Sequence, residues 1–350
     1  MIILAIILCS LGVLQIYSAT HDTVWKDAWW KQLLWLVSGL TAMWFLSSID
    51  YHTLLGQVPL LYLGTMGLLV VTSLVGAKVF GARRWIPLPG GFHFQASEFA
   101  KLVIILLVAR YLTELKTDKL ELRDLFKLLG LVGLPMVMVM RQPDLGTSLT
   151  YLPIVGIGIF LAGLRWRYVA AGLLIAALAL PLGWFVLKDY QRARLVAFVD
   201  PGQDPRGSGY QVIQSKIAVG SGGMWGKGVT RGSQTQLRFL PVPHTDFIFS
   251  AFAEEHGFVG VVVVLALYFL LIMQIVQNAQ TAPDRAGMYV CMGICALLLF
   301  HLLVNVGMVV GRMPVTGIPL PLMSSGGSGM LSVFLMLGLV NNIRLRRFLN

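Results

Sequence analysis

Long, almost uncharged apolar runs recur along the whole of this 350-residue chain, and they constrain its fold more than any other feature. A run of this length is what an α-helix needs to cross a bilayer, where a spanning segment must satisfy its own backbone groups. A window of roughly 19 residues identifies about ten such segments. They fall near residues 1–18, 28–48, 54–75, 96–114, 123–141, 146–164, 167–187, 247–276, 286–311 and 325–343. We therefore predict an all-α, polytopic membrane protein that forms one domain over residues 1–350.

The composition agrees with a membrane chain and excludes several other classes. Hydrophobic residues make up 57% of the sequence and charged residues 12%, far from the balance of a soluble domain. The net charge of +11 is spread over loops, which favours contact with an anionic membrane surface over nucleic-acid binding. Cys9, Cys291 and Cys295 fall within apolar spans, so neither a disulfide framework nor a zinc site is expected.

Lysine and arginine in the short loops predict the orientation. An even number of spans puts both termini on one side, and that side carries the larger set of basic loop residues. The set comprises Arg110, Lys116, Lys119, Arg123, Lys127, Arg165, Arg167, Arg285, Arg344, Arg346 and Arg347. We predict that both termini lie in the cytoplasm, which places a large loop region, residues 188–245, outside the cell.

Three carboxylates stand at the start of the eighth predicted span. Asp246 falls at the mouth of this span, and Glu254 and Glu255 fall inside it. An ionised side chain at the centre of a bilayer costs about 2.5–3.5 kcal/mol even on the most lenient scale. All three residues are therefore candidates for a functional role.

Two further charged positions open predicted spans. Glu98 and Lys101 lie one helical turn apart, and they form either a buried ion pair that locks helices together or a pair that lines a polar cavity. Asp144 follows Pro143 and is placed to cap the next helix through its side-chain oxygen. Its predicted side of the membrane, shared with Glu98 and Asp246, also favours a place in a common cavity.

Residues 188–245 form the only sizeable polar region, and basic residues outnumber acidic ones there. Arg192 and Arg194 are expected either to bind a lipid diphosphate or to lie among lipid headgroups. Apolar residues at helical spacing around 210–218 predict a short amphipathic helix, which carries Lys216. The glycine cluster 220–228 lacks the spacing of a phosphate-binding P-loop, so we interpret it as tight turns.

The stretch 314–328 interrupts helical structure between the last two spans with prolines, glycines and serines. Such backbone is tolerated at membrane depth only where it lines a cavity or is covered by protein. The stretch contributes Ser324, Ser325 and Ser328 to a candidate cavity.

Carboxylates, arginines and a broken loop on one side suggest a site for an anionic, lipid-linked substrate such as a polyprenyl-diphosphate sugar. Sugar transfer with inversion needs a base for the acceptor hydroxyl, and cations for the departing diphosphate. We assign the base to Asp246, and the cations to arginines or to a bound divalent cation, Mg²⁺ or Mn²⁺. A transporter remains the alternative from composition, because transporters also place charges and broken helices at this depth.

Eight motifs, in their order and spacing, resemble the SEDS family (shape, elongation, division and sporulation). They are GARRW (81–85), QASEFAK (95–101), QPDLGT (142–147), GYQVIQS (209–215), GSGG (220–223), HTDFIF (244–249), PLP (319–321) and SSGGS (324–328). The resemblance implies a peptidoglycan glycosyltransferase that polymerises lipid II at the outer face of the bacterial cytoplasmic membrane. It also implies a class B penicillin-binding protein and other elongation-complex proteins as partners. Residues 214–220 and 232–241 look more like the elongation member than the division member.

The resemblance also implies roles for individual residues of this chain. Asp246 takes the place of the catalytic acid, and Glu98, Lys101 and Asp144 take the family's charged cavity positions. The remaining candidates for substrate binding or cavity lining are Arg84, Arg192, Arg194, Lys216, Ser324, Ser325 and Ser328. This chain departs from the family at Ala96, where proline is usual, and at Ser325, where tyrosine is usual. A division polymerase, a lipid II transporter and a non-catalytic scaffold, in which Asp246 only caps a helix, are the alternatives.

Overall fold

The computed structural model describes residues 1–79, 82–115, 120–164, 166–204 and 207–347. Gly81 of the first motif and Lys116, Lys119 and Arg165 of the orientation argument lie outside these residues.

Every predicted span is helical. The helices are α1 (Ile2–Thr20), α2 (Ala28–Ser48), α4 (Val58–Val75), α5 (Ala96–Thr113), α6 (Leu122–Arg141), α8 (Tyr151–Leu161), α9 (Trp166–Val186), α13 (Ile248–Gln280), α14 (Arg285–Val309) and α15 (Gly327–Arg346). Most boundaries differ from the prediction by a few residues, and two predicted spans are divided, because α3 (Tyr51–Gly56) precedes α4 and α7 (Leu145–Leu149) precedes α8. Among the described helices, five (α1, α4, α13, α14 and α15) are long and apolar enough to cross a membrane by length and composition. The predicted all-α class is confirmed.

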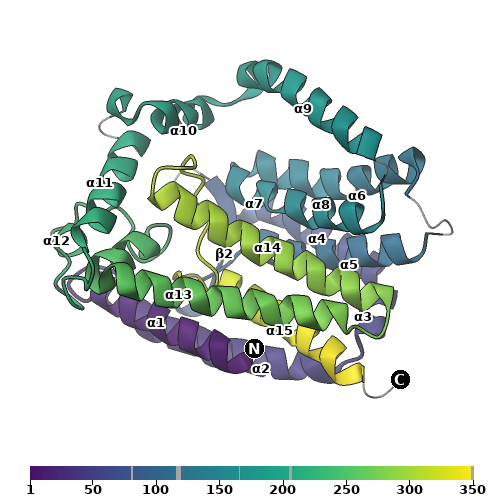
Figure 1. The fold of residues 1–350 in the computed structure, drawn as a ribbon, viewed down its shortest axis with the longest axis horizontal. Coiled ribbons are helices and arrows are strands. Elements are labelled where there is room, and N and C mark those ends of the chain that lie inside the picture. The colour runs from purple at the N-terminus through teal and green to yellow at the C-terminus, as the bar shows by residue number, and fades with distance from the viewer. Residues whose placement is uncertain (80–81, 116–119, 165, 205–206, 348–350) are drawn as a thin grey trace.

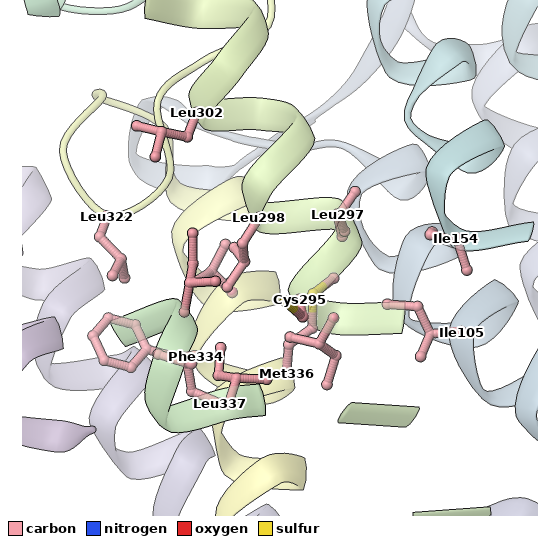
Figure 2. Packing of buried hydrophobic residues seen from close by; sticks show 14 of the residues in the cluster. Ile105, Ile154, Cys295, Leu297, Leu298, Leu302, Leu322, Phe334, Met336 and Leu337 are labelled. Carbon is pink, nitrogen blue, oxygen red and sulfur yellow. The ribbon is translucent and has the colours of Figure 1, made fainter. Parts of the chain in front are cut away.

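Helix α14 lies in the middle of the bundle and packs against α5, α8, α13 and α15 (Figure 1). Figure 2 shows Leu297, Leu298 and Leu302 of this helix directed towards side chains from its neighbours. Those neighbours include Ile105 of α5, Ile154 of α8 and Phe334 of α15, all buried. Tight packing holds helices together where lipid offers no hydrophobic contrast, so the buried face of α14 is held firmly by its neighbours.

Helix α13 is broken at Gly257, which has φ 66° and ψ −166°. The backbone groups freed by the break bond to the loop that precedes the helix in sequence. The N–H of Phe258 donates to the carbonyl of Gly223 at 2.8 Å, and the N–H of Lys227 donates to the carbonyl of Glu254 at 3.0 Å. The loop thus completes the helix where its own ladder stops, as buried backbone groups require.

Residues 222–228 of the glycine cluster form this loop, and there the interpretation as tight turns is confirmed, whereas Gly220 and Ser221 end the helix Ser208–Ser221. Gly223, Gly226 and Gly228 all have positive φ, a conformation that costs glycine little and other residues more. At Gly226 a side chain would also collide with the backbone carbonyl of Glu255. The glycines therefore let the loop lie directly on the broken helix.

The described part of residues 188–245 contains short helices beside the bundle: α10 (Asp189–Val199), η2 (Pro201–Gln203), α11 (Ser208–Ser221) and α12 (Ser233–Gln236). They lead from α9, at the edge of the bundle, back towards α13 (Figure 1). Helix α11 confirms that a short helix forms here, while its location in the membrane interface stays a prediction. Its buried face includes Val212, Ser215 and Ala218, whereas Ile213 and Ile217 are exposed.

A small antiparallel sheet precedes α5, and the sequence analysis missed it. It consists of β1 (Ala77–Val79), β2 (Ala82–Leu88) and β3 (Phe92–Phe94) in the order β1-β2-β3, with a 3₁₀ turn, η1 (Pro89–Gly91), before β3. Ile86 pairs with Phe94, and Leu88 pairs with Phe92. The missed signal is a proline-glycine turn between two short apolar runs, which is typical of a hairpin. The sheet positions Arg84 and leads the chain into α5.

Candidate active site

Asp246 is partly buried at the entry to α13, where three segments meet. Its backbone carbonyl accepts a hydrogen bond of 3.0 Å from the side-chain amide of Asn305 on α14. Its carboxylate lies against the loop between α14 and α15, because a Cβ added to Gly317 would be 3.4 Å from Asp246 Oδ2. The predicted non-helical stretch 314–328 is thus confirmed over 314–326, and it packs beside the predicted catalytic acid.

Two arginines act on the ionisation of Asp246. Burial raises the pKa of the Asp246 carboxyl above the usual aspartate range, and the charges of Arg84 and Arg194 oppose that rise. Asp144 contributes a further, smaller rise in the pKa of Asp246. The carboxylate is therefore a stronger base than an ordinary aspartate, and cations lie beside it.

Asp144 forms the predicted helix cap and also lies beside Arg84, while its place in a common cavity stays a prediction. Its Oδ1 accepts from the backbone N–H of Thr147 at 3.1 Å and caps α7. Its Oδ2 accepts from Gln95 Nε2 at 3.0 Å, and Arg84 Nη1 lies 3.6 Å from Oδ1. The cap thus also holds the arginine that acts on Asp246.

The predicted ion pair of Glu98 and Lys101 is present on α5. Lys101 Nζ lies 2.8 Å from the Glu98 carboxylate, and both side chains are buried. Lys101 Nζ also lies 3.4 Å from His301 Nε2 on α14, so the pair contacts a second helix. Its place in a substrate cavity stays a prediction. Helix α5 begins at Ala96 even without the family's proline there.

The predicted basic residues separate into two groups. Arg194 Nη1 donates to the carbonyl of Thr316 at 3.1 Å and acts on Asp246, as Arg84 does. Arg192 instead donates to the carbonyls of Trp184 and Phe185, at the end of α9. Lys216 is exposed on α11, with its side chain over Gly311. The structure thus brings Arg84 and Arg194, of these four residues, to Asp246.

The three predicted serines attach the loop and α15 to neighbouring backbone. Ser324 Oγ donates to the carbonyl of Thr245 at 2.7 Å, and the backbone N–H of Ser325 donates to the carbonyl of His244 at 2.9 Å. Ser328 Oγ accepts from the backbone N–H of Gln95 at 3.0 Å. These contacts fix the loop beside Asp246, while substrate binding by the serines stays a prediction.

Glu254 and Glu255 anchor neighbouring segments and do not join the site. Glu254 accepts from Lys227 Nζ at 2.8 Å and from the backbone N–H of Gln234 at 2.9 Å. Glu255 accepts from Ser18 Oγ on α1 at 2.5 Å. The functional role expected from their depth is replaced by a structural one, because each carboxylate is satisfied by the segment packed on it.

Sequence reasoning missed His301 and Asn305, two polar residues of α14 beside the site. His301 Nδ1 lies 3.1 Å from the carbonyl of Pro319, and Asn305 Nδ2 lies 2.8 Å from the carbonyl of Ile318. The sequence feature that could have identified them is a histidine and an asparagine one turn apart within the apolar span 286–311. Such residues inside a span face protein and are functional candidates.

Several polar atoms around the site make no hydrogen bond within the part of the chain that the structure describes. They are Arg84 Nε, Tyr151 Oη, Asn305 Oδ1 and Thr316 Oγ1, each buried. Buried polar atoms of this kind are uncommon in folded proteins. The same described residues contain no group of three or more His, Cys, Asp and Glu side chains arranged to hold a metal ion.

Together these features define a polytopic α-helical membrane protein with a buried, charged site where α13, α14 and the following loop meet. The family model for FtsW, RodA and SpoVE, described as "Cell cycle protein", matches residues 1–347, and the chain belongs to this family. The resemblance to SEDS proteins is thereby confirmed.

Curated relatives match this chain over nearly its full length. It is 39% identical to the peptidoglycan glycosyltransferase MrdB of Escherichia coli (strain K12), covering 99% of this chain and 93% of that protein. It is 36% identical to the probable peptidoglycan glycosyltransferase FtsW of Geobacter sp. (strain M18), covering 99% and 96%.

Solved structures of related proteins also match this chain over nearly its full length. One, described as "Structural coordination of polymerization and crosslinking by a peptidoglycan synthase complex", matches with a TM-score of 0.86 and 35% identity, covering 99% of this chain and 97% of that one. The crystal structure of the rod shape determining protein RodA of Thermus thermophilus matches with a TM-score of 0.73 and 29% identity, covering 99% and 96%.

Proposed function

We propose that this chain is a peptidoglycan glycosyltransferase of cell elongation, which polymerises lipid II with Asp246 as the general base. The enzyme class follows from the full-length relatives that carry this activity in their names. The role of Asp246 is supported above all by its surroundings, a partly buried carboxyl with a raised pKa beside Arg84 and Arg194.

The proposed reaction is a single displacement at the anomeric carbon of the donor sugar. Asp246 takes the proton of the acceptor hydroxyl as its oxygen forms the new glycosidic bond, and the bond from the anomeric carbon to the diphosphate oxygen breaks. Arg84 and Arg194 stabilise the negative charge that develops on the departing lipid diphosphate. The raised pKa suits a base, because it strengthens the affinity of Asp246 for that proton.

The proposal also covers the orientation of the chain in the membrane and its partner protein. Both termini lie in the cytoplasm, and the site with residues 188–245 faces the outside, where lipid-linked sugar is polymerised. The partner is a class B penicillin-binding protein, which supplies the transpeptidase. A structural neighbour that coordinates polymerisation with crosslinking supports this pairing.

A divalent cation, Mg²⁺ or Mn²⁺, is proposed to enter with the diphosphate of the substrate. The described residues offer no cluster of three metal ligands, whereas a diphosphate binds such cations through its own oxygens. The cation would add positive charge at the leaving group.

The test is polymerisation of purified lipid II by the chain with its penicillin-binding partner, with gel separation of the glycan strands. Wild type is expected to form strands, and Asp246→Asn to fall by roughly 100- to 10,000-fold because it lacks the base. Strands from both would remove Asp246 as the base. No strands from wild type, with transport of lipid II across vesicles, would instead establish the transporter alternative.

A further inference from the structure

We propose that His301 and Asn305 of α14 are positioning residues, which together set the place of Asp246 relative to the Glu98–Lys101 ion pair. We call these two residues the α14 ladder. The inference rests on the proposed function, because it concerns the geometry of the same base. Neither residue belongs to the charged set that the family motifs indicate.

Asn305 ties two separate segments together through one amide group. Its Nδ2 donates to the carbonyl of Asp246 at 3.0 Å and to the carbonyl of Ile318 at 2.8 Å. The side chain is fully buried, so water does not replace these bonds easily. Asn305 therefore fixes the backbone of the base against the loop that contacts its carboxylate.

His301, one turn earlier, links the same loop to the ion pair. A carbonyl only accepts, so the contact of 3.1 Å with Pro319 places the ring proton on Nδ1. Nε2 is then the acceptor for Lys101 Nζ at 3.4 Å. His301 is thus a neutral imidazole that joins the loop to the Glu98–Lys101 pair.

His301 and Asn305 therefore contact the same loop, between α14 and α15. Ile318 and Pro319 are adjacent, so the α14 ladder binds consecutive carbonyls from one helix face, where residues four apart are neighbours. Because His301 and Asn305 both lie on the buried face of α14, the ladder is a rigid reference for Asp246. A displacement of about 1 Å at a reacting group can cost 100-fold in rate, so loosening the ladder reduces turnover before it reduces substrate binding.

The first test replaces Asn305 and measures kcat and KM for lipid II on folded protein of known concentration. Asn305→Leu keeps the size and removes both donors, and we expect kcat to fall about 10- to 100-fold with KM within about twofold of wild type. The matched control is Asn342→Leu. Asn342 is also buried, and its amide donates to the carbonyls of Leu46 and Ser47 at 3.0 Å each. The control is expected to lose stability but to keep the kcat of wild type.

The second test asks whether His301 acts through its two nitrogen contacts. His301→Gln retains a donor and an acceptor, and His301→Leu retains neither. We expect the leucine variant to lose kcat about 10-fold or more and the glutamine variant to recover most of it. Equal loss in both variants would mean that the ring only fills space, and would remove His301 from the ladder.

A third measurement does not depend on turnover. Asn305→Leu frees the backbone of Asp246 from the loop at Ile318, and the changed surroundings of the carboxyl are expected to shift the titration midpoint of the Asp246 carboxyl band in infrared spectra. The band is identified by its loss in Asp246→Asn. An unchanged midpoint, or wild-type kcat in Asn305→Leu, would overturn the role of Asn305. Wild type without polymer would count against the proposed function instead, and the infrared result would still decide whether Asn305 controls Asp246.

Discussion

Glu254 offers a measurable test of how the loop is held on the broken helix α13. Its fully buried carboxylate accepts from Lys227 Nζ at 2.8 Å, from the backbone N–H groups of Gln234 and Thr235 at 2.9 and 3.2 Å, and from Thr235 Oγ1 at 3.0 Å. Hydrogen bonds to a charged group contribute about 1.5–3 kcal/mol each, and breaking a buried pair costs about 3–5 kcal/mol. Glu254→Gln keeps the shape but removes the charge and turns an NH₂ group towards donors. We expect the free energy of unfolding to fall by about 3–5 kcal/mol.

The assay is unfolding in mixed micelles by titration with sodium dodecyl sulfate, applied to a double-mutant cycle. Lys227→Met is expected to cost less than Glu254→Gln, because the Lys227 side chain is partly exposed and the backbone donors still hold the carboxylate. The two changes together are expected to cost less than their sum, with a coupling of about 1 kcal/mol or more. Glu114→Gln is the matched control, since its pair with Arg110 is exposed and contributes about 0.5 kcal/mol or less. A loss below about 1 kcal/mol in Glu254→Gln, or strict additivity, would refute this account of the loop.

Three further predictions concern the ion pair, pH and metal. Reversing either charge, with Glu98→Lys or Lys101→Glu, is expected to cost about 3–5 kcal/mol and most activity, whereas the double reversal partly restores folding in the same unfolding assay; silent single changes would contradict it. Burial lowers the pKa of His244 to about 4, so the unfolded state binds this proton first as the pH falls. The free energy of unfolding should therefore drop by up to about 3 kcal/mol between pH 6.5 and 4, a drop that His244→Gln removes. Chelation with EDTA should slow polymerisation and leave the unfolding temperature unchanged; an equal rate would remove the divalent cation from the proposal.

Much of the fold was predictable because each spanning helix satisfies its own backbone and must be apolar along its length. Helix α2, for instance, begins and ends at the predicted residues 28 and 48. The sheet at residues 77–94 escaped prediction because its strands are short and their pairing depends on residues that the helical pattern does not mark.

The residues of the site likewise include some that the sequence predicted and some that it did not. Asp246, Asp144 and the Glu98–Lys101 pair were found because charge near a membrane span is costly. Charge alone could not separate Glu254 and Glu255, which are satisfied by neighbouring segments, from Asp246. It also could not separate Arg192, which bonds to the end of α9, from Arg194. That difference depends on tertiary contacts, as does the part played by Asn305, an uncharged residue inside an apolar run.

The dependence of the polymerisation rate on pH tests the central claim, that Asp246 is the general base, most directly. The rate is measured under single-turnover conditions for wild type and for the residual activity of Asp246→Asn. Because burial raises the pKa of Asp246 and the base must be ionised, wild type should lose activity on the acid side at a pH above the usual aspartate range. The account predicts that this acid limb disappears in Asp246→Asn. The same limb in both proteins would assign the titration to another group and contradict the role of Asp246.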